Sequence, residues 1–230
     1  MMLSLLCLIG TFAGYVLVKA LHQRFPYLLL SPAILLPAII ILILVAFNIS
    51  YNTYMQDNQW IVWMLGPATV AFAIPIYEYR GIIRRHALAI GLGICIGMTA
   101  GIVSAFYLAK WFHFDEQTTL SLMSRSISTP FAMALTAHIG GSVQLVIVFT
   151  MITGITGMVL GDVVLAILRL RSTLAQGASL GNAAHGFGTS KAYARHKDEG
   201  VIASLTMVLS GIFMVVAGPS LIHLVIKLLS

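Results

Sequence analysis

Charged residues are scarce in this chain. Only 9% of its residues are Asp, Glu, Lys or Arg, whereas 59% are hydrophobic. A soluble domain carries about a quarter charged residues, so this composition excludes that class and indicates an integral membrane protein. The 230 residues are enough for about six to eight crossings of roughly 20 residues each, with no room for a soluble domain. We therefore expect a single transmembrane domain over residues 1–230.

Cysteines and catalytic motifs are also scarce. Cys7 and Cys95 are the only two cysteines, and both lie in apolar runs, which excludes a disulfide framework and a zinc site. The sequence has no G-x-S-x-G, H-E-x-x-H, P-loop or Rossmann fingerprint. We therefore expect neither an enzyme nor a cofactor or metal. The net charge of +6 comes from short basic clusters between apolar runs, as cytoplasmic loops require, so no nucleic-acid partner is expected.

Apolar runs predict an all-α, polytopic bundle of about six full spans. The first run has neither a preceding basic region nor a small-residue cleavage site, so we expect it to remain as a helix rather than be removed as a signal peptide. Basic clusters, of which Arg80, Arg84 and Arg85 form the strongest, mark the cytoplasmic ends. The polar segment 48–59 is expected to be an outer loop. The predicted spans are 3–20, 28–47, 60–79, 87–109, 143–168 and 201–229.

Two further segments are predicted to re-enter the membrane without crossing it. If 118–138 crossed fully, Arg169 and Arg171 at the end of the next span would face outside. A path that enters and leaves on the outer side keeps this pair in the cytoplasm. The segment 178–190 is too polar and Gly-rich for an ordinary span and runs into a basic stretch, so we expect it to re-enter from the cytoplasmic side.

Three stretches of small and polar residues interrupt the apolar pattern. Non-helical backbone at membrane depth persists only inside protein or around a water-filled cavity. Such broken segments build the substrate sites of many secondary transporters. The predicted breaks are Leu65 to Thr69, Ser126 to Pro130, and Gly181 to Ser190.

A shift of 115 positions aligns the first and third breaks and predicts an internal repeat with discontinuous helices. The halves would be about residues 1–110 and 117–230, and whether they are parallel or inverted is left open. The shift lays Leu65-Gly66, Ala68, Phe72 and Arg80 over Leu180-Gly181, Ala183, Phe187 and Arg195.

Ionisable side chains inside a bilayer are costly and therefore mark candidate sites. Arg125 stands beside hydroxyl residues and could hold a carboxylate in bidentate fashion, or it could snorkel to the outer interface. His185 could bind an anion, relay a proton, or hydrogen-bond a freed carbonyl group. Asp162 could carry a proton or sodium ion, or it could form an ion pair with Arg169 or Lys191.

The residues of the three breaks resemble the LrgB/CidB family over nearly the whole chain and in the expected order. The second motif of that family usually reads Lys-Ser-Val-Thr-Thr-Pro, and the third Ser-His-Ala-Ile-Gly-Thr. The matching stretches here are Leu65 to Ala71 with Ile74 to Tyr77, Arg125-Ser126-Ile127-Ser128-Thr129-Pro130 followed by Phe131 to Met133, and Ala184-His185-Gly186-Phe187-Gly188-Thr189.

The resemblance implies a multi-pass protein of the bacterial cytoplasmic (inner) membrane, with two alternative functions. One is an antiholin-like regulator of murein hydrolase export and autolysis, acting with a small holin-like partner of the LrgA/CidA type. The other is transport of small monocarboxylates such as pyruvate or glycolate. A holin needs no intramembrane backbone breaks, so the breaks favour transport.

In a transporter, Arg125 or His185 would supply the countercharge for the carboxylate. His185 and Asp162 are the candidates for ion or proton coupling. Gly91, Gly93, Gly97 and Gly101 could line a helix contact within one protomer or in a homodimer. The remaining candidate substrate-binding residues are hydroxyl and amide side chains of the breaks, namely Ser128, Thr129, Asn182, Thr189 and Thr69.

Overall fold

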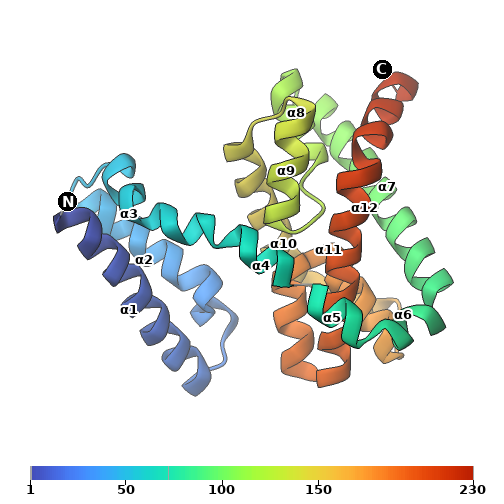
Figure 1. The fold of residues 1–230 in the computed structure, drawn as a ribbon, viewed down its shortest axis with the longest axis horizontal. Helices are drawn as coiled ribbons and strands as arrows, with labels where there is room; N and C mark the ends of the chain where they lie inside the picture. Colours follow the sequence, from blue (N-terminus) through green and yellow to red (C-terminus); the bar gives the residue numbers. More distant parts are fainter. Residues whose placement is uncertain (1, 72, 230) are drawn as a thin grey trace. The chain divides into compact units, whose positions relative to one another are not determined.

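Helices make up all the regular secondary structure in residues 2–71 and 73–229, which are the residues that the computed structural model describes. The side chains of Leu28, Thr69, Ala73 and Pro75 lie outside this description. The chain divides into two units, Met1–Val70 (unit 1) and Ala71–Ser230 (unit 2). Figure 1 labels the helices of both, and each unit is described by itself.

Unit 1 is built around its first helix, which packs against the next two. Gly14 allows close packing here, because a Cβ atom at this position would lie 2.8 Å from Leu36 Cδ1. The hydroxyls of Thr11 and Tyr54 are 3.2 Å apart and join the first helix to the third. The elements are α1 (Met2–Arg24), η1 (Leu28–Leu30), α2 (Pro32–Ala46) and α3 (Tyr51–Trp63).

The predicted outer loop at 48–59 is wrong, because most of it is helix α3. Ser50 caps this helix, and its side-chain oxygen accepts a hydrogen bond from the Thr53 amide at 3.2 Å. A serine at this position satisfies one of the amides that a helix start leaves free. The polar composition of the segment concealed this N-cap signal.

The predicted break at 65–69 is also wrong. These residues lie in α4 (Leu65–Ala71), which is followed by α5 (Ala73–Glu78) and α6 (Arg80–Arg85). Pro67 falls in the first turn of α4, where a helix loses no internal hydrogen bond to proline. The predicted repeat is not confirmed, because 65–71 is helical whereas 180–195 folds back on itself, as described below.

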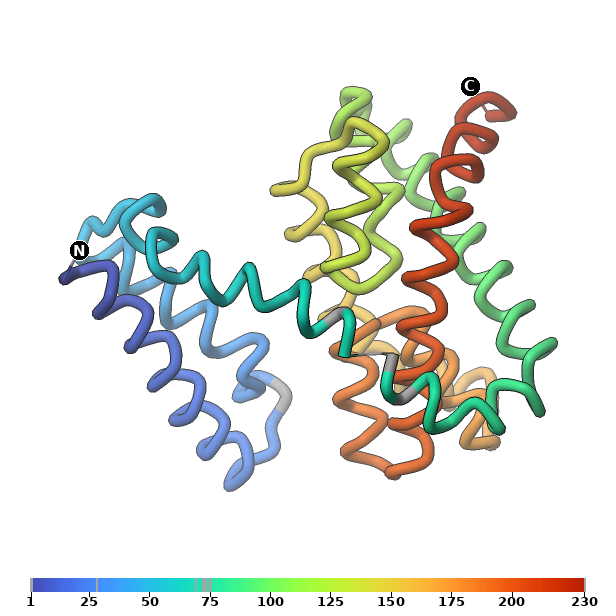
Figure 2. The backbone as a smooth tube through the Cα atoms, in the orientation of Figure 1, coloured from blue at the N-terminus to red at the C-terminus, as the bar shows by residue number. Residues whose placement is uncertain are grey.

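Unit 2 contains three long helices separated by shorter or broken ones, and Figure 2 traces their path. Among the described residues, four helices are long and apolar enough to cross a membrane, namely α1, α7, α10 and α12, so the predicted count of about six full spans is not confirmed. The elements of unit 2 after α6 are α7 (Ala87–Trp111), α8 (Glu116–Met123), α9 (Thr129–Ile139), α10 (Val143–Ile167), α11 (Thr173–Arg195) and α12 (Lys197–Leu229).

Helices α8 and α9 form a hairpin, and the residues just after α9 contact α8. The Ser142 amide, just after α9, donates to the Ser121 hydroxyl in α8 at 2.7 Å. Gly140 ends α9 in the left-handed conformation, with φ of 85°. At Gly141 a Cβ atom would lie 3.0 Å from Ser121 Oγ, so only glycine fits well between the arms. The residues that follow the first hairpin (116–139) thus lie beside its first arm, and re-entry of this segment from the outer side stays a prediction.

Helix α11 is a second hairpin (173–195). His185 alone interrupts it, with φ of 50° and ψ of −127°. The arm that follows returns beside the arm that precedes, because Arg195 Nη2 donates to Gln176 Oε1 at 2.7 Å. Helix α12 lies alongside both arms (Figure 1). The predicted break in 181–190 is therefore confirmed, although it is confined to one residue.

The two hairpins open toward opposite ends of unit 2. Lys110 at the end of α7 donates to the carbonyl of Leu229 at the end of α12, at 3.3 Å, and the first hairpin begins directly after α7. Helix α10 runs from the first hairpin to the opposite end, where Arg169 and Arg171 precede the second hairpin. The charge rule predicts that this end is cytoplasmic.

Candidate functional site

The tips of the two hairpins meet inside unit 2. The His185 ring lies against the backbone of Ser126 and within electrostatic range of Arg125. Helix α7 contacts both tips through glycines: Gly101 faces the Ser126 side chain, and Gly97 faces the side chain of Asn182. Two of the four glycines predicted to line a helix contact therefore do so within one protomer.

The first tip consists of residues 124–128, between α8 and α9. Ser128 is extended, with φ of −64° and ψ of 147°, and forms the N-cap of α9, whose first turn contains Pro130. Proline has no amide hydrogen and is accepted where a helix starts. The Ser128 hydroxyl is buried, does not cap the helix, and has no hydrogen-bond partner among the described residues. The Ser-Thr-Pro sequence thus places a helix start, and an uncommitted hydroxyl, at the tip.

Both tips are also the starting points of helices. Helix α9 begins at the first tip, and the arm 186–195 begins after His185 at the second. The first turn of a helix presents free amide groups and the positive end of the helix dipole, which together favour anions. Two positive helix ends therefore converge in one region of the protein.

Arg125 supplies a full positive charge to this region. Its guanidinium is only partly exposed, and Nη1 donates to the Thr153 hydroxyl of α10 at 2.9 Å. Its Nε is buried and has no partner among the residues described. The side chain thus extends toward α10 inside unit 2. The geometry leaves donor capacity for a planar anion.

His185 occupies the second tip and is only 3% exposed. Neither ring nitrogen has a hydrogen-bond partner among the described residues. A buried imidazole with uncommitted nitrogens can accept or donate a proton, depending on its tautomer. Its position beside Arg125 keeps both predicted countercharge candidates in one region.

The remaining predicted residues have different surroundings. Asn182 is braced by the protein, because its Oδ1 accepts from Ser210 Oγ at 2.6 Å and its Nδ2 donates to the Gly93 carbonyl at 3.3 Å. Thr189 donates to Met207 Sδ at 3.8 Å. Thr129 is half-buried at the start of α9. Thr69 belongs to unit 1, and its side chain lies outside the described residues.

A cavity of about 380 Å³ adjoins Arg125. It follows α10 on one side and the first arm of the second hairpin on the other, and it is lined mainly by apolar side chains. Because Arg125 bonds Thr153, its charge lies toward the end where α10 begins to line the cavity. The other end lies near Leu165, toward the basic loop. Its lining includes Thr153, Thr156, Leu160, Leu165, Ser179 and Leu180.

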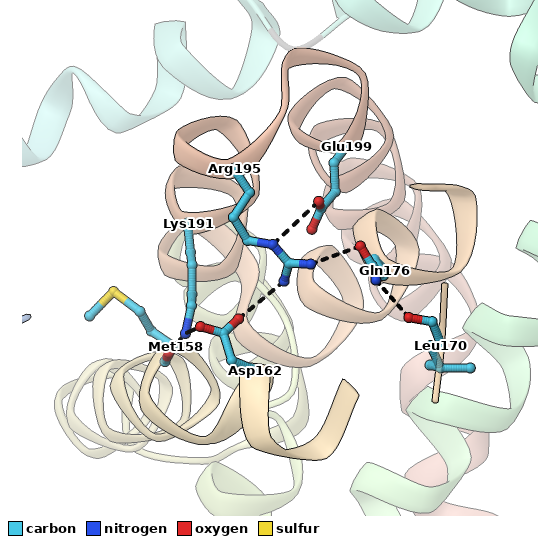
Figure 3. A network of polar contacts seen from close by, with 7 residues as sticks. All are labelled: Met158, Asp162, Leu170, Gln176, Lys191, Arg195 and Glu199. Carbon is cyan, nitrogen blue, oxygen red and sulfur yellow. Dashed lines mark hydrogen bonds and ion pairs between the residues drawn. The ribbon is translucent and has the colours of Figure 1, made fainter. Parts of the chain in front are cut away.

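An ionic network closes the open end of the second hairpin (Figure 3). Asp162 of α10 pairs with Lys191 at 2.8 Å and with Arg195 at 3.1 Å, both in the second arm. Arg195 also pairs with Glu199 of α12 at 3.5 Å and bonds Gln176 in the first arm. The network therefore ties α10, both arms and α12 together.

Of the two ion pairs predicted for Asp162, the structure contains the one with Lys191 and not the one with Arg169. Its side chain is 55% exposed, so it lies nearer the surface than the hairpin tips do. Its charge is already compensated by two cations. The structure thus separates Asp162 from Arg125 and His185, although all three were grouped as candidates.

We expect Asp162→Asn to lower the melting temperature modestly. The ion pairs of Asp162, the most exposed member of the network at 55%, should contribute about 0.5–1 kcal/mol to stability, because water and salt screen the pairs of an exposed carboxylate. Thermal unfolding in detergent at low and high salt measures this effect. Glu78→Gln, which removes an exposed carboxylate elsewhere, is the matched control. An equal loss at both salt concentrations would contradict an ionic origin.

No group of three or more His, Cys, Asp or Glu side chains in the described part of the chain could hold a metal ion. The chemistry that the tips offer is electrostatic and hydrogen-bonding, directed at an anion. At the described tips the titratable side chains are Arg125 and His185, and the ionic network lies at the open end of the second hairpin.

Several residues of the site were not predicted from the sequence. Thr153 holds Arg125, and Ser210 holds Asn182. A signal for the first existed: Thr150, Thr153 and Thr156 recur every three residues in the apolar run of α10. No local signal connects Ser210, in α12, with the second tip.

Comparisons with known proteins agree with the resemblance found in the sequence. The model of the LrgB-like family matches residues 11–224. The chain is 36% identical over 222 residues to Bacillus subtilis YwbG, described as an uncharacterized protein, covering 96% of this chain and 99% of YwbG. It is 32% identical over 221 residues to the holin-like protein CidB of Staphylococcus aureus, covering 96% of both chains. No solved structure matches significantly.

Proposed function

Since the chain belongs to the LrgB-like family, and since the tips of two helical hairpins converge on a partly buried arginine, we propose that it is a membrane transporter of small monocarboxylates. The observation that carries the proposal is the meeting of Arg125 with two helix starts. A single carboxylate matches one guanidinium with free donors and the partial positive charges of two helix ends.

The candidate substrates are small 2-oxo or 2-hydroxy acids such as pyruvate or glycolate. Arg125 would bind the carboxylate, and the uncommitted hydroxyl of Ser128 would bond the 2-oxo or 2-hydroxy oxygen together with Thr129. Asn182 and Thr189 already have protein partners, so we give them the role of positioning the second tip. His185 is the preferred proton carrier, because it lies beside Arg125 whereas Asp162 is held in ion pairs.

The two hairpins open toward opposite ends of unit 2, and this arrangement supports the transport proposal. Helix α7 with the first hairpin and α10 with the second hairpin run in opposite directions, and α7 and α10 each have 25 residues. Inverted pairs of this kind, with broken helices that meet near the midplane, give transporters alternating access. We propose that these pairs, rather than halves meeting near residue 110, form the internal repeat.

The alternative function is an antiholin-like regulator of murein hydrolase export. The name of the Staphylococcus aureus relative, holin-like protein CidB, favours it. In this case the protein would act in the bacterial inner membrane with a small holin-like partner of the LrgA/CidA type. A homodimer would be a further arrangement, since Gly91 and Gly93 face open space on α7.

Uptake into proteoliposomes tests the two proposals together. We expect saturable uptake of radiolabelled pyruvate or glycolate by the purified chain, alone or with its small partner, and no release of an entrapped dye. A transport site saturates because it must bind each substrate before it moves. Dye release without saturable uptake would favour the holin-like function.

The same uptake assay tests whether transport is coupled to the movement of protons. A proton gradient across the liposome membrane should stimulate uptake if His185 carries a proton, because the proton would then cross the membrane together with the substrate. Uptake that is insensitive to the gradient would indicate facilitated diffusion. Protein-free liposomes provide the baseline for both measurements.

A further inference from the structure

The cavity beside Arg125 is larger and more apolar than a three-carbon acid requires. Its volume is about 380 Å³, within the range of about 300–1,000 Å³ that is typical of sites for larger organic ligands. Its one charged group lies at one end, where Arg125 and Thr153 meet, while single hydroxyls of Thr156 and Ser179 line it farther along. Leu160, Val164 and Leu165 line the remainder along α10.

This distribution of charge and apolar surface defines the ligand that fits. A carboxylate bound to Arg125 would direct the rest of the molecule along α10 and the first arm of the second hairpin. The side chains there, including Leu180, offer dispersion contacts but few hydrogen bonds. The α10 wall of the cavity is about half exposed, at 53% for Ile152 and 50% for Leu160, so a ligand body would be covered by protein on one side. A hydrocarbon body gains from contact with this wall, whereas a hydroxylated body finds few partners for its hydroxyls there.

We propose that the cavity selects 2-oxo monocarboxylates with an apolar side chain of several carbons over pyruvate and glycolate. This inference rests on the proposed transport function and specifies the substrate class of the same site. The carboxylate binds at Arg125, and the side chain extends past Leu160 toward Leu165. Each buried methylene raises affinity up to about fourfold.

A binding series tests the proposal. The full chain in detergent is titrated with pyruvate, 2-oxobutanoate and 4-methyl-2-oxopentanoate, and displacement of radiolabelled pyruvate is measured. Protein-free micelles correct for partition of the acids into detergent. We expect the dissociation constant to fall by at least about tenfold from pyruvate to the branched acid, since its three additional carbons are partly buried.

Two substitutions on α10 locate the effect. Leu160→Asn makes the cavity wall polar and should abolish the gain with chain length. Val163→Asn is the matched control, because Val163 is similarly exposed, at 55% against 50%, but does not line the cavity. Val163→Asn should show the same fall in dissociation constant from pyruvate to the branched acid as the wild type.

Failure of this inference is distinguishable from failure of the transport proposal. Pyruvate binding with no gain along the series would overturn the inference and leave the proposed function intact. The same conclusion would follow if Leu160→Asn and Val163→Asn behaved alike. Absence of binding by every acid would overturn both.

Discussion

Replacing Arg125 with glutamine should reduce carboxylate uptake by about a hundredfold or more. The guanidinium is the only full positive charge where the two described hairpin tips meet, and it bonds Thr153 in α10. Loss of one partner of a buried charge pair costs about 2–5 kcal/mol, which corresponds to about 30-fold to several thousandfold in binding. Initial rates of uptake into proteoliposomes measure the effect.

The stability of the same variant distinguishes a binding role from a structural one. Arg125 carries a partly buried charge with an unpartnered Nε, and burial of a charge without a countercharge is unfavourable. Arg125→Gln should therefore unfold at a temperature equal to or above that of the wild type. A marked drop in melting temperature, together with lost uptake, would show that Arg125 mainly holds the hairpin against α10. Arg171→Gln, which removes an exposed arginine, controls for the change in net charge.

Gly181→Ala should prevent correct packing of the second hairpin. A Cβ atom at this position would overlap the carbonyl oxygen of Ala203 in α12. The obstacle is backbone on both sides, so neither helix can yield by a side-chain rotation. Overpacking of this kind costs about 1–3 kcal/mol and occasionally more, and we expect a value at the upper end. Thermal unfolding and the yield of monodisperse protein in detergent measure it.

Gly91→Ala provides the comparison for this prediction. Gly91 is also helical, but nothing lies within 4 Å of an added Cβ atom. Alanine is favoured over glycine in a helix by about 1 kcal/mol, so this variant should be as stable as the wild type or slightly more so. If both alanine variants lowered stability equally, close packing against Ala203 would not be the reason for Gly181.

The sequence predicted the two breaks that form the site because their signals are local. Ser128, Thr129 and Pro130 start a helix inside an apolar run, and small residues surround His185. The charge rule also predicts that the first hairpin is re-entrant, and the Ser121–Ser142 hydrogen bond shows that the chain after α9 lies beside α8. Local composition and charge thus determine where this chain is interrupted.

Other features could not be predicted from local patterns. Pro67 was taken as a breaker, but its effect depends on where the helix begins, and it lies in the first turn of α4. The contacts of Arg125 with Thr153 and of Asn182 with Ser210 join residues 28 positions apart in the chain. Such partners depend on how helices cross, which hydrophobic periodicity does not specify.

The order in which the ribosome produces these helices sets a constraint on assembly. The second hairpin emerges before α12, yet α12 supplies the backbone against which Gly177 and Gly181 pack. Until α12 has inserted, the polar tip around His185 lacks one wall and its broken backbone would meet lipid. Completion of the site is therefore a late, post-insertion event. A nascent chain that ends before residue 197 should be a substrate for membrane quality-control proteases.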